Sequence, residues 1–389
     1  MGSGRALLLY TCLALQSFAQ ANINDRSQAV RRAQTLESLG RQMFFDSSLS
    51  ASGKLSCASC HDPAFAYGPP NALAVQLGGV SGRQSGIRAV PSLRYLQATP
   101  QFTEHGFEEE TTGADSVDNG PTGGLTWDGR VDRGRQQARI PLLSPFEMAN
   151  PSEASVVAKT LKATYSEDLM KLSAGPDTKR LFETILEAFE SWEENYREFY
   201  PYDSKYDLWL AGRANLTSAE SRGLKLFTDP DKGNCARCHT AKRGVNGTPP
   251  QFTDYGLVAL GVPRNVDIPA NANANWYDLG MCGPVRTDLS NRGEYCGRFM
   301  TPSLRNVARR RVFFHNGVVH SLKEAVKFYV NRDSSPNKFD DLPLQYRGNV
   351  DTETPFGRTV GSPPVLTDQD IDDIVAFLGT LTDRFQATH

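Results

Sequence analysis

Two copies of a Cys-x-x-Cys-His motif, Cys57–His61 and Cys235–His239, are the residues of this chain best suited to chemistry. Two thiols at this spacing can each form a thioether bond to the edge of one haem, and the adjacent histidine can then bind the iron. The motif is typical of c-type haem attachment, and its repetition in a chain with six histidines predicts two covalently bound haems. The expected attachment and axial residues are Cys57, Cys60, His61, Cys235, Cys238 and His239.

A zinc site is the alternative reading of two Cys-x-x-Cys pairs. Zinc-binding pairs usually close over about 15 to 20 residues. Cys60 and Cys235 are instead separated by a large part of the chain. The spacing therefore favours haem over zinc.

Two further cysteines, Cys282 and Cys296, lie outside the motifs. In an oxidising compartment they could close a loop of about 15 residues by a disulfide, which stabilises a fold by ~3 kcal/mol in the chain-entropy model. Two free buried thiols are the alternative.

The N-terminus has the features of an export signal. Arg5 precedes a short apolar stretch, and Ala19-Gln20-Ala21 has the small-x-small form of a cleavage site. We expect residues 1–21 to be a signal peptide, cleaved near Ala21, and the mature protein to be periplasmic or otherwise exported. A lipid-modified Cys12 is the alternative. No other stretch approaches the ~20 apolar residues of a membrane span.

The charge balance bears on partners. The chain has 389 residues, with 42 Lys and Arg against 44 Asp and Glu and a net charge of -2. This gives no electrostatic reason to expect nucleic acid as a partner.

The elements that must position the two motifs also occur twice. Gly40–Asp46 and Gly223–Asp229 are similar stretches before the motifs, and Pro-Ser-Leu-Arg follows each motif at Pro91–Arg94 and Pro302–Arg305. In a third echo, Trp127-Asp128-Gly129 corresponds to His315-Asn316-Gly317. The chain is therefore predicted to be a duplicated module.

The spacing of apolar residues predicts a mainly α fold of two tandem cytochrome c-like domains, each wrapped around one covalently attached haem. Capping boxes at Thr217–Glu220 and Thr367–Asp370 are expected to open helices. The expected parts are an N-terminal domain at 22–165, a helical connection at 166–209 and a C-terminal domain at 210–389.

The repeat also predicts that the distal sides of the two haems differ. Counting equally from Gly129 and Gly317, the first module offers Pro141 where the second offers Tyr329. Proline has no ligating side chain, whereas a tyrosine phenolate can bind haem iron. We therefore expect an open haem in the first module and one closed by His239 and Tyr329 in the second. An ordinary aromatic residue on a helix is the alternative for Tyr329.

An open haem can bind peroxide, whose cleavage needs a group to shuttle a proton. Glu147 lies shortly after Pro141, and Gln137 one helical turn before it. We predict Glu147 as the proton shuttle and Gln137 as a hydrogen-bonding companion. The alternative places Gln137 on a solvated face and Glu147 in a surface turn.

Several motifs together resemble the bacterial di-haem cytochrome c peroxidase and MauG superfamily across nearly the whole mature chain. They are the doubled Cys-x-x-Cys-His, Leu125–Arg130, Pro302–Val307 and Phe314–Gly317. The resemblance implies that Trp127 bridges the haems, that Gln137, Pro141 and Glu147 form the peroxide pocket, and that Tyr329 is the distal ligand of the second haem.

Three positions bear on the branch of this superfamily. Tyr329 stands where ordinary peroxidases have Met, and this resembles the MauG branch, while Ala64–Asn71 is similar to its MbnH relatives. Leu77 stands where ordinary peroxidases carry a histidine that blocks the first iron, so the resemblance implies a first haem that is ready without reduction.

The chain departs from the family at two positions. Ala89 stands where the family's calcium site uses Asn, so calcium would rest on backbone carbonyls and water. Gly233 stands where MauG presents a tryptophan as a surface relay, which puts the electron exit route in doubt. Arg309–Arg311 could pair with haem propionates, and a solvated basic edge is the alternative.

The functional hypothesis is an exported di-haem oxidase that reacts with hydrogen peroxide and uses the oxidised haem pair to oxidise a residue, Trp by resemblance, on a partner protein. One alternative is a peroxidase that scavenges peroxide with electrons from a small cytochrome or copper protein. A non-catalytic di-haem electron carrier is the alternative of another class.

Overall fold

The computed structural model describes residues 25–108, 117, 118, 120–244, 247–334 and 339–386, so the predicted signal peptide lies outside the described residues. Residues 25–44 form the first helix. The other α-helices are α2 (Cys57–Cys60), α3 (Gly134–Leu143), α4 (Glu153–Thr160), α5 (Ser166–Leu172), α6 (Thr178–Glu193), α7 (Tyr196–Phe199), α8 (Lys205–Leu210), α9 (Ser218–Thr228), α10 (Leu322–Asn331) and α11 (Asp368–Gly379).

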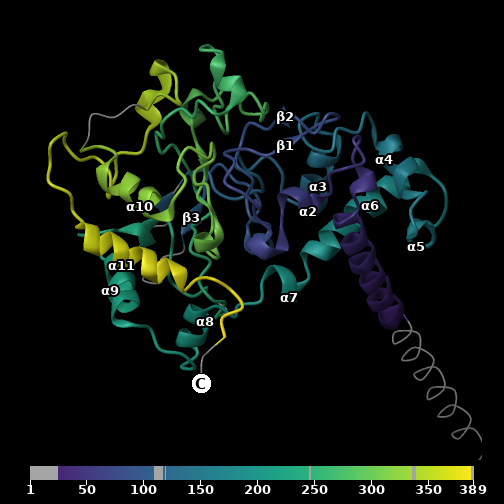
Figure 1. Ribbon diagram of the computed structural model, residues 1–389, viewed down its shortest axis with the longest axis horizontal. Helices are drawn as coiled ribbons and strands as arrows, with labels where there is room; N and C mark the ends of the chain where they lie inside the picture. The colour runs from purple at the N-terminus through teal and green to yellow at the C-terminus, as the bar shows by residue number, and fades with distance from the viewer. Residues whose placement is uncertain (1–24, 109–116, 119, 245–246, 335–338, 387–389) are drawn as a thin grey trace, which may run out of the picture.

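Short strands accompany the helices as antiparallel pairs. They are β1 (Leu77–Gly78) with β2 (Gln84–Ser85), β3 (Phe107–Glu108) with β4 (Val117–Asp118), and β5 (Leu257–Val258) with β6 (Phe299–Met300). The described chain is therefore helix-dominated with small sheets, which confirms the predicted mainly α class at this level (Figure 1).

The first hydrophobic core is built where helix 25–44 crosses α6. Gly40 allows this contact, because a Cβ at this position would lie 1.9 Å from the carbonyl oxygen of Ala188. Buried side chains of both helices, of α4 and of α5 fill this core, which lies at the right of Figure 1. Helix α6, which falls within the predicted connection, is thus part of the core of the first half.

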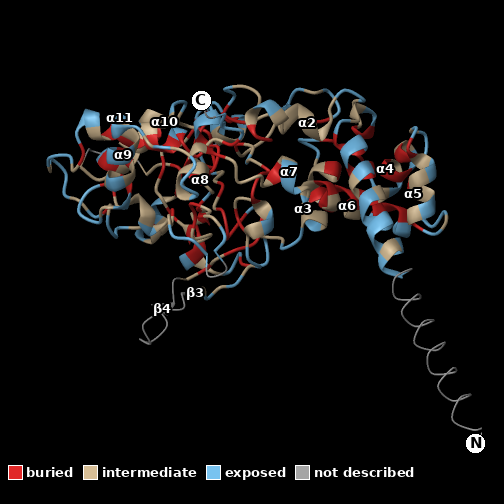
Figure 2. Ribbon diagram, turned by 90° about the horizontal axis from the view of Figure 1, so that it is seen from below, coloured by how far each residue is buried: buried red, intermediate tan, exposed pale blue. Residues whose placement is uncertain are grey.

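The second core repeats this arrangement with α9 and α11, at the left of Figures 1 and 2. A Cβ on Gly223 of α9 would lie 1.9 Å from the carbonyl oxygen of Asp373 in α11. The capping boxes predicted at Thr217 and Thr367 are confirmed, since each hydroxyl accepts a bond from the amide three residues on. These caps stabilise the first turns of the helices.

The loops of the third repeated motif, at Trp127–Gly129 and His315–Gly317, have similar backbone conformations. Thr126 and Phe314 have φ of 74° and 65°, and Gly129 and Gly317 have φ of 66° and 64°. Isolated bridges close both loops, Leu125 to Val131 and Phe313 to Val319. The predicted correspondence of Trp127 with His315 is therefore confirmed by the backbone.

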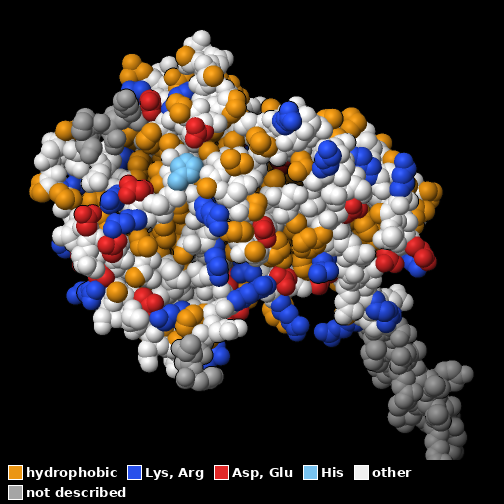
Figure 3. Space-filling model, viewed as in Figure 1, with side chains coloured by type: hydrophobic (Ala, Val, Ile, Leu, Met, Phe, Trp, Pro, Cys, Tyr) orange, Lys and Arg blue, Asp and Glu red, His pale blue; other side chains and the backbone are white. Residues whose placement is uncertain are grey.

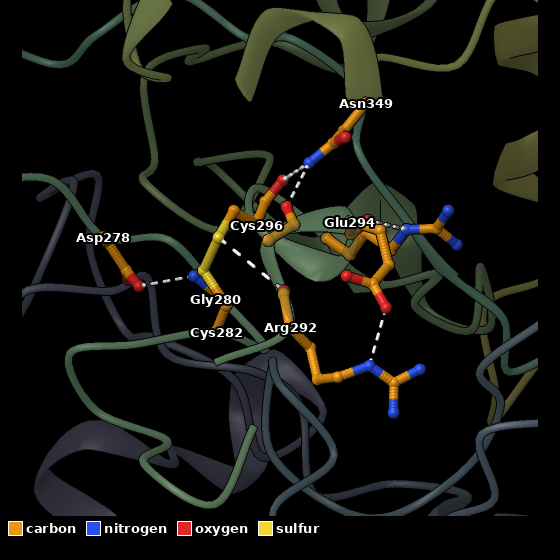
Figure 4. Close-up of a disulfide and its surroundings, with 9 residues drawn as sticks. Asp278, Gly280, Cys282, Arg292, Glu294, Cys296 and Asn349 are labelled. Atoms are coloured by element: carbon orange, nitrogen blue, oxygen red, sulfur yellow. Dashed lines mark hydrogen bonds and ion pairs between the residues drawn. A yellow bond between two sulfur atoms is a disulfide. The ribbon is translucent and has the colours of Figure 1, made fainter. Parts of the chain in front are cut away.

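A third cluster surrounds a disulfide between Cys282 and Cys296, so the bonded form is the one of the two alternatives that the structure has (Figure 4). The Asn349 side chain donates to the carbonyl oxygens of Gly293 and Cys296 and so ties this loop to a later segment of the same half. Among the described helices, none combines the length and apolar character needed to cross a membrane.

Candidate functional site

Both Cys-x-x-Cys-His motifs open onto one continuous cavity of about 840 Å³. Its lining comes from both halves of the chain and is largely apolar. Figure 3 shows hydrophobic side chains gathered in a hollowed part of one face, with Lys and Arg side chains beside it. The predicted residues that line the cavity are Cys57, Cys60, His61, Trp127, Gln137, Pro141, Glu147, Cys235, Cys238, His239 and Tyr329.

The two motif histidines are oriented in the same way. His61 Nδ1 lies 3.0 Å from the carbonyl oxygen of Tyr67, and His239 Nδ1 lies 3.0 Å from that of Phe252. A carbonyl can only accept, so Nδ1 carries the proton and Nε2 is left with its lone pair. Desolvation by burial lowers the pKa of both imidazoles to about 4. Each histidine is therefore neutral at pH 7, in the form that binds iron.

The motif cysteines have the character of haem-attachment thiols. All four are free in the structure, and they line the cavity in two separate pairs. Burial raises the pKa of Cys60 to about 11 and those of Cys235 and Cys238 to about 12, which keeps the thiols protonated. Within the described ranges no three His, Cys, Asp or Glu side chains gather as a metal-binding group, so the zinc alternative has no ligand set.

Two polar groups that line the cavity, the Tyr255 hydroxyl and the Arg310 guanidinium, could bind a carboxylate. The Tyr255 hydroxyl is buried and has no hydrogen-bond partner in the structure. The Arg310 guanidinium donates only to backbone carbonyls, of Val90 and Val312, and burial lowers its pKa to about 10. A buried cation and an orphaned hydroxyl fit the carboxylates of a haem. Arg309 and Arg311 are exposed, so only the middle arginine of this run reaches the cavity.

The predicted peroxide pocket is brought together in the first half. Gln137 and Pro141 both lie on α3, one turn apart, and both line the cavity. Glu147 follows α3 and is held by backbone bonds, from its own amide to the Ser144 carbonyl and from the Gly79 amide to its carbonyl. Leu77 of β1 also lines the cavity. An apolar side chain thus stands at the position where, by the resemblance, ordinary peroxidases carry the histidine that blocks the first iron.

Glu147 is an exposed residue that lines the cavity. Desolvation by the surrounding protein raises its pKa, while a hydrogen bond with Ser144 and the charge of Arg130 act in the opposite direction. A carboxyl group with a raised pKa both accepts and returns a proton more readily near neutral pH. This is the property that a proton shuttle requires.

The second half presents Tyr329 to the cavity from α10. Its ring packs at 5.7 Å from the ring of Phe356 and 6.2 Å from that of Phe314, which fixes its direction. Burial raises the pKa of the Tyr329 phenol, and the nearby thiols Cys238 and Cys235 add to this shift. Tyr329 and both thiols of the second motif line the same cavity.

Trp127 is held by two hydrogen bonds where the halves meet. Its indole Nε1 donates to the carbonyl oxygen of Ala89 at 2.7 Å, and its own carbonyl accepts from the Met300 amide at 2.8 Å. The Ala89 amide in turn donates to the carbonyl of His315 at 2.7 Å. The loops of Trp127 and His315 therefore meet through Ala89.

A buried ion network beside Trp127 was not predicted. Arg88 binds Asp278 through Nε and Nη2 at 2.6 and 2.8 Å, and Asp128 through Nη1 at 2.7 Å. Ala89, which stands at the family's calcium position, thus directly follows an arginine whose guanidinium is held by two carboxylates. The partners come from distant parts of the sequence, and no local pattern links them.

Two further residues near the site escaped prediction, Glu193 and Tyr67. Glu193 of α6 lines the cavity, and burial raises its pKa to about 8, with the charge of Glu190 adding to the shift. The Tyr67 carbonyl binds His61. An alignment of α6 with α11 pairs Glu193 with the apolar Leu378. A carboxyl group at the place of a core leucine is the signal that could have found Glu193.

Comparisons with known proteins agree with this geometry. A family model for di-haem cytochrome c peroxidases matches residues 34–215. The chain is 32% identical to methylamine utilization protein MauG of Paracoccus denitrificans over 399 aligned residues, which cover 97% of this chain and 96% of that protein.

Solved structures give the same result. The di-haem peroxidase BthA of Burkholderia thailandensis superposes with a TM-score of 0.79 at 38% identity, over 90% of this chain and 86% of that chain. A MauG-like protein associated with microbial copper homeostasis superposes with a TM-score of 0.63 at 26% identity, over 90% of each chain. The chain thus belongs to the di-haem cytochrome c peroxidase and MauG superfamily, whose members carry two c-type haems, and it is a peroxide-dependent oxidoreductase of that type.

Proposed function

We propose that this protein is an exported di-haem enzyme that reacts with hydrogen peroxide in its first half and oxidises a tryptophan on a partner protein. When bound, the two haems supply the redox chemistry, and His61, His239 and Tyr329 are the proposed axial ligands. One observation carries the proposal: a single cavity faces Pro141 in one half and Tyr329 in the other. Proline leaves room for peroxide where the phenol would fill it.

The side chains around Pro141 handle the substrate in this proposal. Gln137 donates a hydrogen bond that orients peroxide, and Glu147 takes the proton from one oxygen and returns it to the other. Trp127 then lies on the electron path between the halves. Its fixed indole, with Nε1 bonded to Ala89, supports this role because the ring is held in one orientation.

The protein partner is proposed from two lines of support. Tyr329 in place of Met is the feature that resembles the MauG branch, and the chain is similar to MauG and to a MauG-like protein over most of its length. The disulfide between Cys282 and Cys296 supports export, because disulfides persist in oxidising compartments.

The first test mixes the oxidised protein with hydrogen peroxide, without prior reduction, and follows the haem absorption by stopped flow. Rapid formation of a long-lived oxidised form supports the proposal, whereas a requirement for prior reduction supports a scavenging peroxidase. No reaction at all would leave an electron carrier. Mass spectrometry of candidate partner proteins after peroxide treatment then looks for oxygen added to tryptophan.

Trp127→Phe tests the electron path. Phenylalanine keeps most of the packing but removes the easily oxidised indole, so haem content and unfolding temperature should stay as in the parent while the oxidised form decays faster. An oxidised form of unchanged lifetime would make Trp127 a packing residue only, as large buried aromatics often are.

A further inference from the structure

Tyr67 and Phe252 occupy equivalent places in the two halves. Each main-chain carbonyl accepts the Nδ1 proton of its motif histidine at 3.0 Å. The same carbonyls also accept from the amides of Leu93 and Leu304 at 3.2 and 3.3 Å, and the φ angles are 56° and 55°. The two carbonyls therefore hold their histidines in the same way. The residue that does this in the second half, Phe252, has no hydroxyl.

The Tyr67 side chain is enclosed, and its hydroxyl is paired with a carboxylate. The residue is 1% exposed, and its ring packs at 4.4 Å from the ring of Phe199 and 5.7 Å from that of Phe44. The hydroxyl donates to Glu198 Oε2 at 3.0 Å. A hydroxyl is costly to bury unless it is paired, so its presence here calls for a role that Phe252 does not have.

Glu198 connects this phenol to the outer surface. Its side chain is 33% exposed, and Oε2 also binds the Arg384 guanidinium at 2.8 Å. Arg384 is itself 55% exposed. The Glu198 carboxylate thus connects the buried Tyr67 phenol to solvent. The backbone of the same Tyr67 contacts the motif histidine His61.

The acidity of an oxidised phenol decides which form of oxidised tyrosine this place would hold. A phenol that loses an electron becomes a strong acid, so loss of the electron is accompanied by loss of the hydroxyl proton. Glu198 is the acceptor already in hydrogen-bond contact.

We propose that Tyr67 is an electron relay between the His61 haem site and the surface at Glu198, an inference that rests on the proposed peroxide reaction. In the outward step, one electron passes from the phenol to the peroxide-oxidised centre, the O–H bond breaks, and the proton moves to Glu198. The product is a neutral tyrosyl radical beside a protonated carboxyl group. A one-electron reductant at the surface then restores the phenol as Glu198 returns the proton.

The test uses the full-length di-haem protein, mixed with hydrogen peroxide and frozen at increasing times for electron paramagnetic resonance. Protein grown with ring-deuterated tyrosine identifies a tyrosyl signal by its altered line shape. We expect this signal in the parent and its loss in Tyr67→Phe, which has the side chain that Phe252 already shows to fit.

A matched control is Tyr165→Phe. Tyr165 is also a buried phenol of the first core that donates to a carboxylate, Asp46, but its carbonyl accepts from the Leu169 amide rather than from a motif histidine. This variant should keep the radical signal. Thermal unfolding and haem content, measured on both variants, check that each is folded and loaded.

Glu198→Gln removes the proton acceptor but keeps the phenol. Because a positioned base contributes roughly 100-fold or more to a proton transfer, the tyrosyl signal should appear roughly 100-fold more slowly in this variant. The same signal at the same rate in Tyr67→Phe would overturn the relay. A parent that does not react with peroxide would instead overturn the proposed function, so the two failures are distinguishable.

Discussion

Helices α6 and α11 close the two halves with the same geometry but face the cavity with different chemistry. Ala188 and Asp373 provide the carbonyls that contact Gly40 and Gly223, and the next contacts come four residues later, from Trp192 and Phe377. One residue further along, Glu193 and Leu378 both line the cavity. The backbone framework is thus shared, while a carboxyl group in the first half stands where the second half has a leucine.

The same contrast is found at two further pairs of equivalent residues. Pro141 and Tyr329 stand at equivalent positions on α3 and α10, and Tyr67 and Phe252 on the two histidine-binding turns. The first half presents Pro141 and the carboxyl group of Glu193 to the cavity, whereas the second half presents Tyr329 and Leu378 at the equivalent places. A duplicated framework can therefore divide one reaction between two unequal sites.

Replacing Pro141 with tyrosine should have the largest effect, because it gives the first half the distal residue of the second. The phenol would fill the side on which we propose that peroxide binds, so peroxide consumption should fall to background. Stopped-flow absorption with excess peroxide measures this. Pro141→Ala, which leaves the side open, is the control and should retain the reaction. Full activity in Pro141→Tyr would show that peroxide reacts elsewhere.

Glu147→Gln should slow the peroxide reaction by roughly 100-fold, the usual contribution of a positioned acid–base group. The pH profile gives a second readout. The pKa of Glu147 is raised, and the ionised form must take the proton from peroxide, so the parent rate should fall as pH decreases through a value above that of an ordinary glutamate. This acid limb should be absent from Glu147→Gln. Its persistence there would assign the limb to another group.

Tyr329→Phe sharpens the comparison from the second half. If the phenolate binds the iron, its loss should leave both haems attached but change the ligation of one, and it should raise the reduction potential of that haem because an anionic ligand is gone. Electron paramagnetic resonance and a potentiometric titration measure the two effects. A spectrum identical to that of the parent would exclude Tyr329 as a ligand.

Glu193→Leu should have the smallest effect, on stability rather than on rate. Burial raises the Glu193 pKa from 4.5 to about 8, so the unfolded chain loses this proton at a lower pH than the folded one. The contribution of Glu193 to stability is then fully present below pH 4.5 and is lost as the pH rises through about 8. Glu193→Leu should remove this decline in the haem-free protein, as denaturant unfolding at several pH values would show.

Glu187→Leu controls for the gain of a leucine on the same helix, since Glu187 lies on the exposed side of α6 and binds Arg32. A decline of equal size in Glu193→Leu and in the parent would assign it to other groups.

The sequence predicted those features of the fold and site that depend on local patterns. The two motifs, the capping boxes at Thr217 and Thr367, and the correspondence of the Trp127 and His315 loops were all readable from neighbouring residues. A count of cysteines singled out Cys282 and Cys296 as a pair, but it left open whether they are bonded.

Features that depend on contacts between distant residues were not predicted. The pairing of Arg88 with Asp278 joins residues 190 positions apart, and the packing of α6 on helix 25–44 depends on a glycine whose partner is far along the chain. Tyr67 belongs to a stretch that was noted in the sequence. The direction of its side chain, however, depends on positive φ angles at Ala66 and Tyr67 that the residue types do not suggest.

The close contact at Gly40 has a consequence for how the chain is synthesised. Helix 25–44 emerges from the ribosome early, but its partner α6 emerges only after the first motif and α3 to α5 have followed. Contacts of such large sequence separation form slowly. Until α6 (Thr178–Glu193) has been synthesised, the nascent chain carries the first motif but lacks the α6 side chains of the first core. A fragment meant to fold alone should therefore end beyond Phe199, the last buried residue of this core, and a fragment cut at 165 should expose the Gly40 face and aggregate.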